Sequence, residues 1–200
     1  MRILLALAAL SITACATTRA TPPTQGWQYA ATDKDRQRLR DWRAAFSKAL
    51  SQARAAGNAA DVAQEGVLLD PDAAVGGVPI PDGNYRCRTV KVGAKTEGML
   101  NFIAYPAFRC RIEAGNAQRF TKLTGSQRPV GLIYPADGLR QVFLGTMVLG
   151  DETQPYRYGR DPDRDLAAWV ERIGNNRWRM VFPYPHFEST LDVIELTPEQ

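Results

Sequence analysis

The sequence predicts an α+β fold, mostly β, in which an N-terminal amphipathic helix precedes an antiparallel β-barrel or sandwich. Two observations carry this prediction. Apolar residues recur at helical spacing between residues 33 and 56, and from residue 84 onward they alternate with polar residues in short runs separated by turn-forming residues. Strands spaced so closely are expected to pair antiparallel, because parallel pairing needs long crossover connections. The length fits one globular domain.

The N-terminal segment has the features of a signal peptide. One basic residue, Arg2, precedes an apolar run that is shorter than the ~20 residues needed to span a bilayer. The small residues before Cys15 resemble the bacterial lipobox, whose cysteine is lipid-modified after cleavage. We therefore expect residues 1–14 to be removed and Cys15 to be the lipid anchor. Ala16 rather than an aspartate follows Cys15, which favours the periplasmic face of the outer membrane; a soluble periplasmic protein is the alternative.

Residues 15–32 are expected to form a tether, because they are rich in Thr and Pro and hold few large apolar groups. A single globular domain should follow over residues 33–198 and begin with a helix over residues 33–56. Thr32 is the expected N-cap of this helix and Gly57 its C-terminal stop. The apolar stripe of the helix is interpreted as core packing; it contains Leu39, Trp42, Phe46, Ala49, Leu50 and Ala53.

The β-domain is expected over residues 84–197. Period-two patterns bounded by Gly, Pro, Asn, Asp or Ser define its strands. The expected strands cover residues 85–92, 99–105, 108–113, 119–123, 130–134, 141–149, 168–173, 177–182 and 191–196.

The hairpin with the clearest pattern covers residues 168–182, where an Asn-Asn pair provides a two-residue turn. This turn would place Trp169, Glu171 and Trp178 on one apolar face. A carboxylate on such a face is costly unless it is paired, so the three residues are candidates to line a ligand cavity, with a rim position for Glu171 as the alternative. The expected cross-strand pairs are Trp169 with Phe182, Glu171 with Met180 and Ile173 with Trp178.

Cys87 and Cys110 are the two cysteines left once Cys15 is assigned to lipid. A structural zinc site needs four ligands, and with a single histidine the sequence offers too few. Two cysteines in an oxidising compartment usually pair, so we expect a Cys87–Cys110 disulfide, with two free buried thiols as the alternative. No metal or other cofactor is expected.

The disulfide would make the two cysteine strands direct neighbours. An intervening strand would separate the cysteines by ~9.6 Å, whereas a disulfide tolerates at most ~7 Å between Cα atoms. Residues 95–105 would then be an excursion. With Cys87 opposite Cys110, the flanking arginines share the other face, and the expected pairs are Arg86 with Arg111 and Arg88 with Arg109.

These four arginines are the candidate anion-binding residues, because guanidinium groups bind phosphate and carboxylate through paired donors. They lie in the most basic part of the chain, residues 84–129, which holds nine Lys and Arg and two acidic residues. The alternative is a solvated or internally paired face, for which Asp161, Asp163 and Asp165 are candidate partners.

Several segments resemble the bacterial domain-of-unknown-function family 4893, a family of envelope proteins. They are YRCRTVKVG, YPAFRCRIEAG, FTKLTGSQRPVGLIYP, FLGTMVLGDE, YGRDPDRD, ERIGNNRWRMVFPYPHFESTLDVIEL and the DWRAAFSKAL helix. The resemblance covers most of the chain from Asp33 to Pro198 and agrees with export. It implies no particular catalytic or binding residue.

No catalytic residue is expected, because the chain has one histidine and no nucleophile elbow, and its cysteines are already assigned. We expect a non-catalytic binding module that is attached to the membrane through its lipid anchor. Its partner would be an anionic envelope polymer or a periplasmic protein, and no nucleic acid is expected. The first alternative is a barrel that holds a small apolar ligand near Trp169 and Trp178. The second is a periplasmic hydrolase, which a carboxylate pair about 5–9.5 Å apart in a cleft would indicate.

Overall fold

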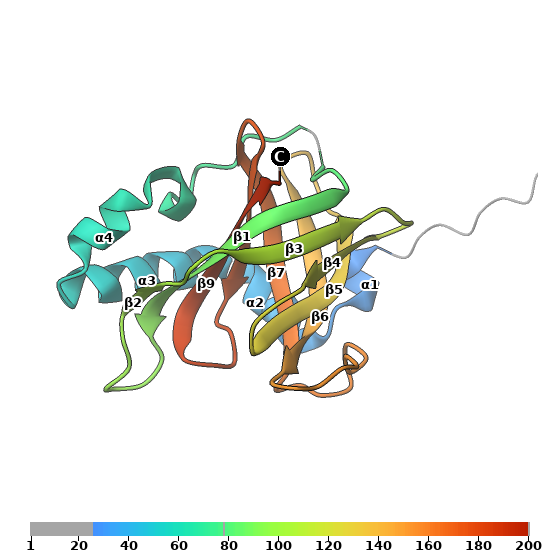
Figure 1. Cartoon of the computed structure of the whole chain (residues 1–200). Helices are drawn as coiled ribbons and strands as arrows, with labels where there is room; N and C mark the ends of the chain where they lie inside the picture. Colours follow the sequence, from blue (N-terminus) through green and yellow to red (C-terminus); the bar gives the residue numbers. More distant parts are fainter. Residues whose placement is uncertain (1–25, 78, 200) are drawn as a thin grey trace, which may run out of the picture.

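Eight antiparallel strands close into a β-barrel in the computed structural model of the chain (Figure 1). Neighbours in the barrel wall are neighbours in sequence, and β9 pairs back onto β1 to complete the closure. The mostly β fold predicted from the sequence is confirmed. The structure describes residues 26–77 and 79–199, so residues 1–14, Cys15 and most of the expected tether lie outside the described residues.

All nine expected strands are present. The strand β2 is shorter than expected and pairs only with the C-terminal end of β1, next to β3 on the same edge. The strands are β1 (Gly83–Ala94), β2 (Phe102–Ala104), β3 (Phe108–Glu113), β4 (Gln118–Lys122), β5 (Gln127–Pro135), β6 (Arg140–Leu149), β7 (Asp165–Gly174), β8 (Arg177–Pro183) and β9 (Ser189–Pro198).

The expected helix over residues 33–56 is interrupted at Asp41, where the backbone leaves helical geometry (φ −87°, ψ 8°). Its ends are as predicted: the Thr32 hydroxyl accepts a hydrogen bond from the Asp35 amide, and Gly57 has a left-handed φ of +91°. None of the described helices is long and apolar enough to span a bilayer. The helices are α1 (Trp27–Ala30), α2 (Asp33–Arg40), α3 (Trp42–Ala55), α4 (Ala59–Gln64) and the 3₁₀ helix η1 (Gly66–Leu69).

The packed part of the chain begins earlier than the expected boundary at residue 33. Trp27 in α1 stacks edge-on against Trp169 of β7, with ring centroids 5.9 Å apart. Ala31 is buried against the same part of the barrel wall. Residues 27–32 therefore belong to the globular domain, because Trp27 and Ala31 both pack on the barrel wall.

Two apolar layers hold the domain together. Helices α2 and α3 lie against the outside of the barrel. In Figure 1 these helices are behind the strands. The face of α3 that holds Phe46 and Ala49 packs on outward-facing valines of β1, β8 and β9, such as Val92. The second layer fills the barrel with inward-facing side chains; it includes Tyr85, Cys87, Cys110, Phe120, Ile133, Phe143, Val170, Trp178, Met180, Phe182 and Leu196.

Candidate ligand-binding site

The disulfide between Cys87 and Cys110 is present, with 6.0 Å between the Cα atoms, and β1 and β3 are direct neighbours as predicted. The predicted register is wrong, however. Tyr85 lies opposite Cys110, and Cys87 lies opposite Phe108. The bridge joins two residues on the same face that are diagonal across the strands, because 6.0 Å is within the reach of a disulfide.

This register breaks up the predicted arginine cluster. Arg86 lies opposite Arg109, not Arg111, and Arg111 lies opposite Asn84. Arg88 lies beyond the end of the β1–β3 pairing, so it faces no arginine of β3. The predicted pairs of Arg86 with Arg111 and of Arg88 with Arg109 are therefore both wrong, although all four arginines do lie on the strand face opposite the cysteines.

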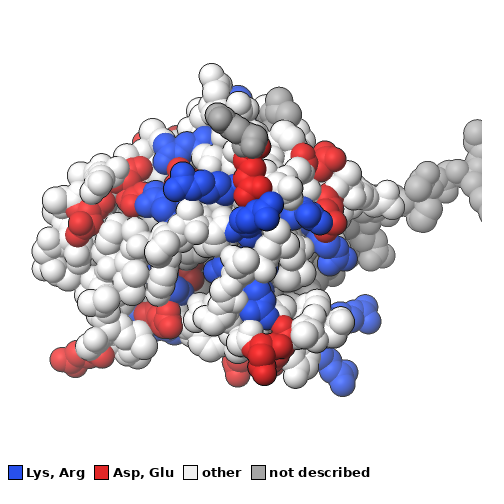
Figure 2. All heavy atoms as spheres, viewed as in Figure 1, with Lys and Arg blue, Asp and Glu red and all other residues white. Residues whose placement is uncertain are grey.

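Carboxylates accompany the arginines on this outer face, and Figure 2 shows Lys and Arg side chains with Asp and Glu side chains among them. Arg88 pairs with Glu65 at 2.5 Å and with Glu195 at 2.9 Å. The hydrogen bonds that Arg88 donates to Glu65, followed by those that it donates to Glu195, hold the pKa of Arg88 above its ordinary value even though partial burial opposes this. Arg109 pairs with Glu199 at 3.0 Å. Two of the four candidate arginines are thus paired internally.

The partners of these arginines differ from the predicted ones. Asp161 pairs instead with Arg164, and Asp165 is buried, where its carboxylate accepts a hydrogen bond from the Gly159 amide. Asp163 lies 3.7 Å from His186. The acidic residues of the long β6–β7 loop therefore contact groups at their own end of the barrel and not the four candidate arginines.

The predicted cross-strand pairs of the β7–β8 hairpin are also wrong. The turn is as expected, since Gly174 lies opposite Arg177, but Ile173 forms a bulge that shifts the register by one residue. Glu171 consequently lies opposite Arg179, and Trp169 opposite Val181. Trp178 points into the barrel, whereas Trp169 and Glu171 point out of it, so these three residues do not line a common cavity.

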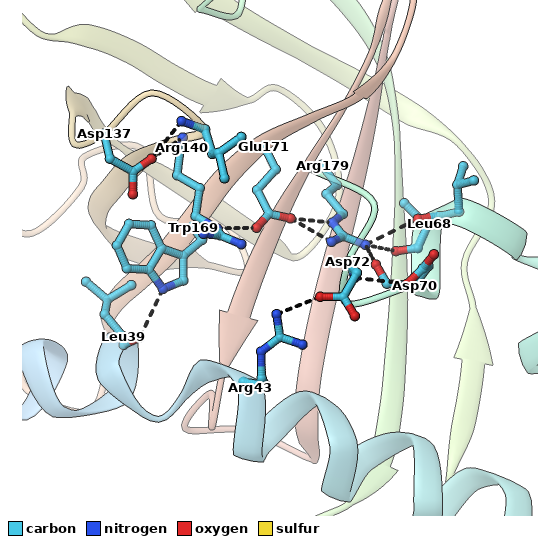
Figure 3. Close-up of polar contacts among 12 residues, drawn as sticks. Leu39, Arg43, Leu68, Asp70, Asp72, Asp137, Arg140, Trp169, Glu171 and Arg179 are labelled. Carbon is cyan, nitrogen blue, oxygen red and sulfur yellow. Dashed lines mark hydrogen bonds and ion pairs between the residues drawn. The ribbon is translucent and has the colours of Figure 1, made fainter. Parts of the chain in front are cut away.

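Glu171 instead forms a buried ion cluster between the barrel and the helices (Figure 3). Its Oε2 lies 2.7 Å from Nε and 2.6 Å from Nη2 of Arg179, and its Oε1 lies 2.6 Å from Nε of Arg140. The side chains of Glu171 and Arg179 are both completely buried. Nη1 of Arg179 also donates to the carbonyl oxygens of Leu68 and Asp70, at the end of η1. This cluster fastens the helical layer to the barrel wall.

A cavity of about 420 Å³ opens at the end of the barrel that lies away from the β7–β8 turn. Its volume is within the size range of small-molecule sites. The β4–β5 turn and the β8–β9 loop, both at the lower end of the barrel in Figure 1, form part of its rim. Its floor is apolar and consists of inward-facing residues of β6 to β9: Met147, Leu166, Phe182 and Ile194. Its wall includes Thr89, Tyr105, Phe108 and Pro129.

The cavity contains a buried lysine with two carboxylate partners. Nζ of Lys91 lies 2.9 Å from Asp192, directly opposite on β9, and 3.3 Å from Glu188 in the β8–β9 loop. Burial works against the charged form of Lys91, but the two carboxylates outweigh it and raise the pKa above its ordinary value. Lys91 is therefore a satisfied cation.

The second lysine of the cavity, Lys122, has a different environment. It follows the buried Phe120 by two residues on β4, so its side chain enters the barrel, and Nζ lies 4.0 Å from the ring centroid of Phe108. Across residues 26–77 and 79–199, no carboxylate lies within 4.0 Å of Nζ. Burial, followed by the charges of Lys91 and Arg128, lowers the pKa of Lys122 to about 8.

Asp192 and Glu188 form a carboxylate pair in the cavity, the feature that would have indicated a hydrolase. Both contact the same Nζ atom, so their separation is below the upper spacing of catalytic pairs, about 9.5 Å. A catalytic pair, however, needs one protonated acid and one free base. Burial raises the pKa of Asp192, although the charge of Lys91 opposes this. Both carboxylates lie against one ammonium, so we interpret them as the counter-ions of Lys91.

Sequence reasoning missed these cavity residues, although the alternation of the strands contained the signal. Lys122 has the same parity as Phe120, and Asp192 has the same parity as Ile194 and Leu196, so each should point inward with its apolar neighbours. Inward-facing charged residues at the ends of barrel strands mark an opening, because only there can they reach water or a ligand.

Comparisons with known proteins give the family of the chain. No curated protein and no solved structure matches it significantly. The family model described as "Domain of unknown function (DUF4893)" matches residues 27–196, which run from α1 to the C-terminal part of β9. The chain therefore belongs to the DUF4893 family.

Proposed function

We propose that the protein binds one small, mainly apolar molecule in the cavity at the open end of its barrel. The observation that carries this proposal is the apolar floor of a cavity of about 420 Å³ inside a barrel whose other half is filled by its own side chains. Eight-stranded barrels have an interior wide enough for one small ligand when side chains leave it open. The predicted arginine patch supports a surface-binding function less well, because its register is different and two of its residues are paired.

The opposite end of the barrel is covered by the segment between η1 and β1. The amide of Val75 donates to the carbonyl oxygen of Arg172 at 2.9 Å, and Nε of Arg172 donates back to Gly76 at 3.1 Å. Ile80 from the same segment is buried in the barrel core. A ligand would therefore enter from the cavity end.

The rim of the cavity is held in shape before any ligand arrives. Arg128 donates to the carbonyl oxygens of Gly125 and Gly150 at 2.6 Å each and of Glu152 at 2.7 Å. These bonds tie the β4–β5 turn to the β6–β7 loop. A preformed rim lowers the entropic cost of binding, which suits a small ligand with few contacts.

The binding test uses the mature chain carrying Cys15→Ser, which removes the lipid, and the neutral fluorescent probe N-phenyl-1-naphthylamine. We expect the probe to bind and Thr89→Trp to weaken its binding by about tenfold or more, because the indole would project from the wall and fill part of the cavity. Thr121→Trp is the matched control: Thr121 is also half-buried but lies on the outer face of β4.

The two tryptophan variants separate binding from folding. Both should give urea-unfolding midpoints close to that of the parent chain. A parent chain that does not bind the probe, or a folded Thr89→Trp chain that binds it as tightly as Thr121→Trp, would overturn the proposal.

We also propose that the protein acts in the bacterial envelope, attached by lipid at Cys15 to the periplasmic face of the outer membrane. The lipobox-like sequence and the Cys87–Cys110 disulfide both support this location, since disulfides persist in oxidising compartments. Its contacts would be the membrane through the anchor and a small envelope molecule in the barrel. A larger anionic polymer or a periplasmic protein is a less supported partner.

The anchor is tested by expressing the wild type and Cys15→Ser in a Gram-negative host with labelled palmitate. We expect the wild type to incorporate label and to sediment with membranes, because more than one acyl chain gives stable anchoring. The variant should lose the label and move to the soluble periplasmic fraction. Equal labelling of both proteins would contradict the assignment.

A further inference from the structure

We propose that Lys122 binds the anionic head group, a carboxylate or a phosphate, of an amphipathic ligand whose apolar part occupies the cavity floor. This inference rests on the proposed function. It starts from the position of Lys122 between the apolar floor and the solvent-facing β4–β5 turn. A ligand oriented with its tail inward would bring its head group to this level of the barrel.

The charges of the cavity favour an anion at this point. Lys91 and Asp192 form a buried pair, with side chains 7% and 13% exposed, and cancel each other locally. Glu188 is 44% exposed, so water screens its charge. Lys122 is then the partly buried charge that has an aromatic ring in place of a carboxylate partner.

The charged groups around Lys122 also leave an excess of positive charge at this point of the cavity. Lys91 on β1 and Arg128 on β5 disfavour its ammonium form, and together they outweigh Asp192 on β9. The other titratable groups that line the cavity are Glu188 and Tyr105. An anionic head group would supply the counter-charge that the site lacks, and it would favour the protonated form of Lys122.

The experiment compares ligands that differ only in the head group. Decanoate, decyl phosphate and decanol each displace N-phenyl-1-naphthylamine from the Cys15→Ser mature chain. A hydrogen bond to a charged group contributes enough that Lys122→Gln should weaken an anionic ligand by about tenfold or more, and decanol by less than about twofold. Lys48→Gln, at an exposed lysine of α3, is the control with the same change in charge.

The pH dependence gives a readout that a structural role of Lys122 would not produce. Because the pKa of Lys122 is about 8, the anionic ligand should bind roughly tenfold more weakly at about pH 9.5 than at about pH 7, while decanol binding stays constant. Lys122→Arg should keep the affinity and remove this pH dependence, since a guanidinium does not deprotonate in this range. At about pH 8, binding to the parent chain should take up protons, measured by calorimetry in two buffers.

The outcomes separate this inference from the proposed function. Loss of affinity in Lys122→Gln for decanoate, decyl phosphate or both supports the inference and identifies the head group. If all three ligands bind and Lys122→Gln weakens none of them selectively, the inference is wrong and the proposed function stands. If none of the ligands and no probe binds, both fail.

Discussion

Replacing Glu171 with Ala is expected to lower the free energy of unfolding by about 3–5 kcal/mol, the usual cost of leaving one member of a buried ion pair without its partner. Arg179 is completely buried and keeps its hydrogen bonds to the Leu68 and Asp70 carbonyls in this variant, so it cannot turn to solvent. Burial already disfavours its charged form and lowers its pKa. Urea unfolding of the Cys15→Ser mature chain measures the effect.

Two further variants distinguish charge from packing. Glu171→Gln keeps the size and one acceptor oxygen but removes the charge, so it should fall between Glu171→Ala and the parent chain. Asp72→Ala removes the exposed partner of Arg43 in the same region (Figure 3) and should leave the midpoint almost unchanged. Similar midpoints for Glu171→Ala and Asp72→Ala would show that the buried cluster does not hold the helices to the barrel.

The strands were predictable because their information is local. Alternation and turn residues located all nine strands, and Phe108–Glu113 was placed to the residue. Closure into a barrel could not be chosen over a sandwich in the same way. Closure depends on the pairing of β9 with β1, about a hundred residues away. The valines of these two strands are outward-facing core residues under α3. Their pattern is also compatible with the inner face of a sandwich.

The registers were not predictable, and the predicted cross-strand neighbours of the candidate residues were wrong for that reason. One bulged residue, Ile173, reversed the face that Trp169 and Glu171 share with Trp178, because side chains alternate with a period of two. The cysteine pair shifted by two residues, which kept the faces but changed every arginine neighbour. Motif reading therefore located the correct strands with the wrong cross-strand neighbours, while inward parity alone would have placed Lys122 inside the barrel.

Removing the disulfide with Cys87→Ala and Cys110→Ala together is expected to lower the free energy of unfolding by roughly 3 kcal/mol. The two cysteines are 23 positions apart, and in the chain-entropy model a bridge of that span removes about this much entropy from the unfolded chain. The comparison again uses the Cys15→Ser mature chain, in which these are the remaining cysteines. Urea unfolding with and without reductant gives the difference.

The reductant provides the internal control for this prediction. The reduced parent chain should unfold at the midpoint of the double-alanine chain, and the double-alanine chain should not respond to reductant. A difference below about 1 kcal/mol would mean that the unfolded chain is already restricted in this region.

Loss of the bridge should reach the cavity as well, because Cys87 lies directly opposite Phe108, whose ring contacts the ammonium of Lys122. The bridge joins β1 to β3, which carries this ring, so the reduced chain should hold Phe108 and Lys122 less firmly. We expect weaker binding of decanoate under conditions where the reduced chain is still folded. Decanol should be affected less, because it carries no charge that Lys122 has to meet. If Lys122 binds an anionic head group as proposed, the disulfide would then help to hold the part of the cavity wall beside that group.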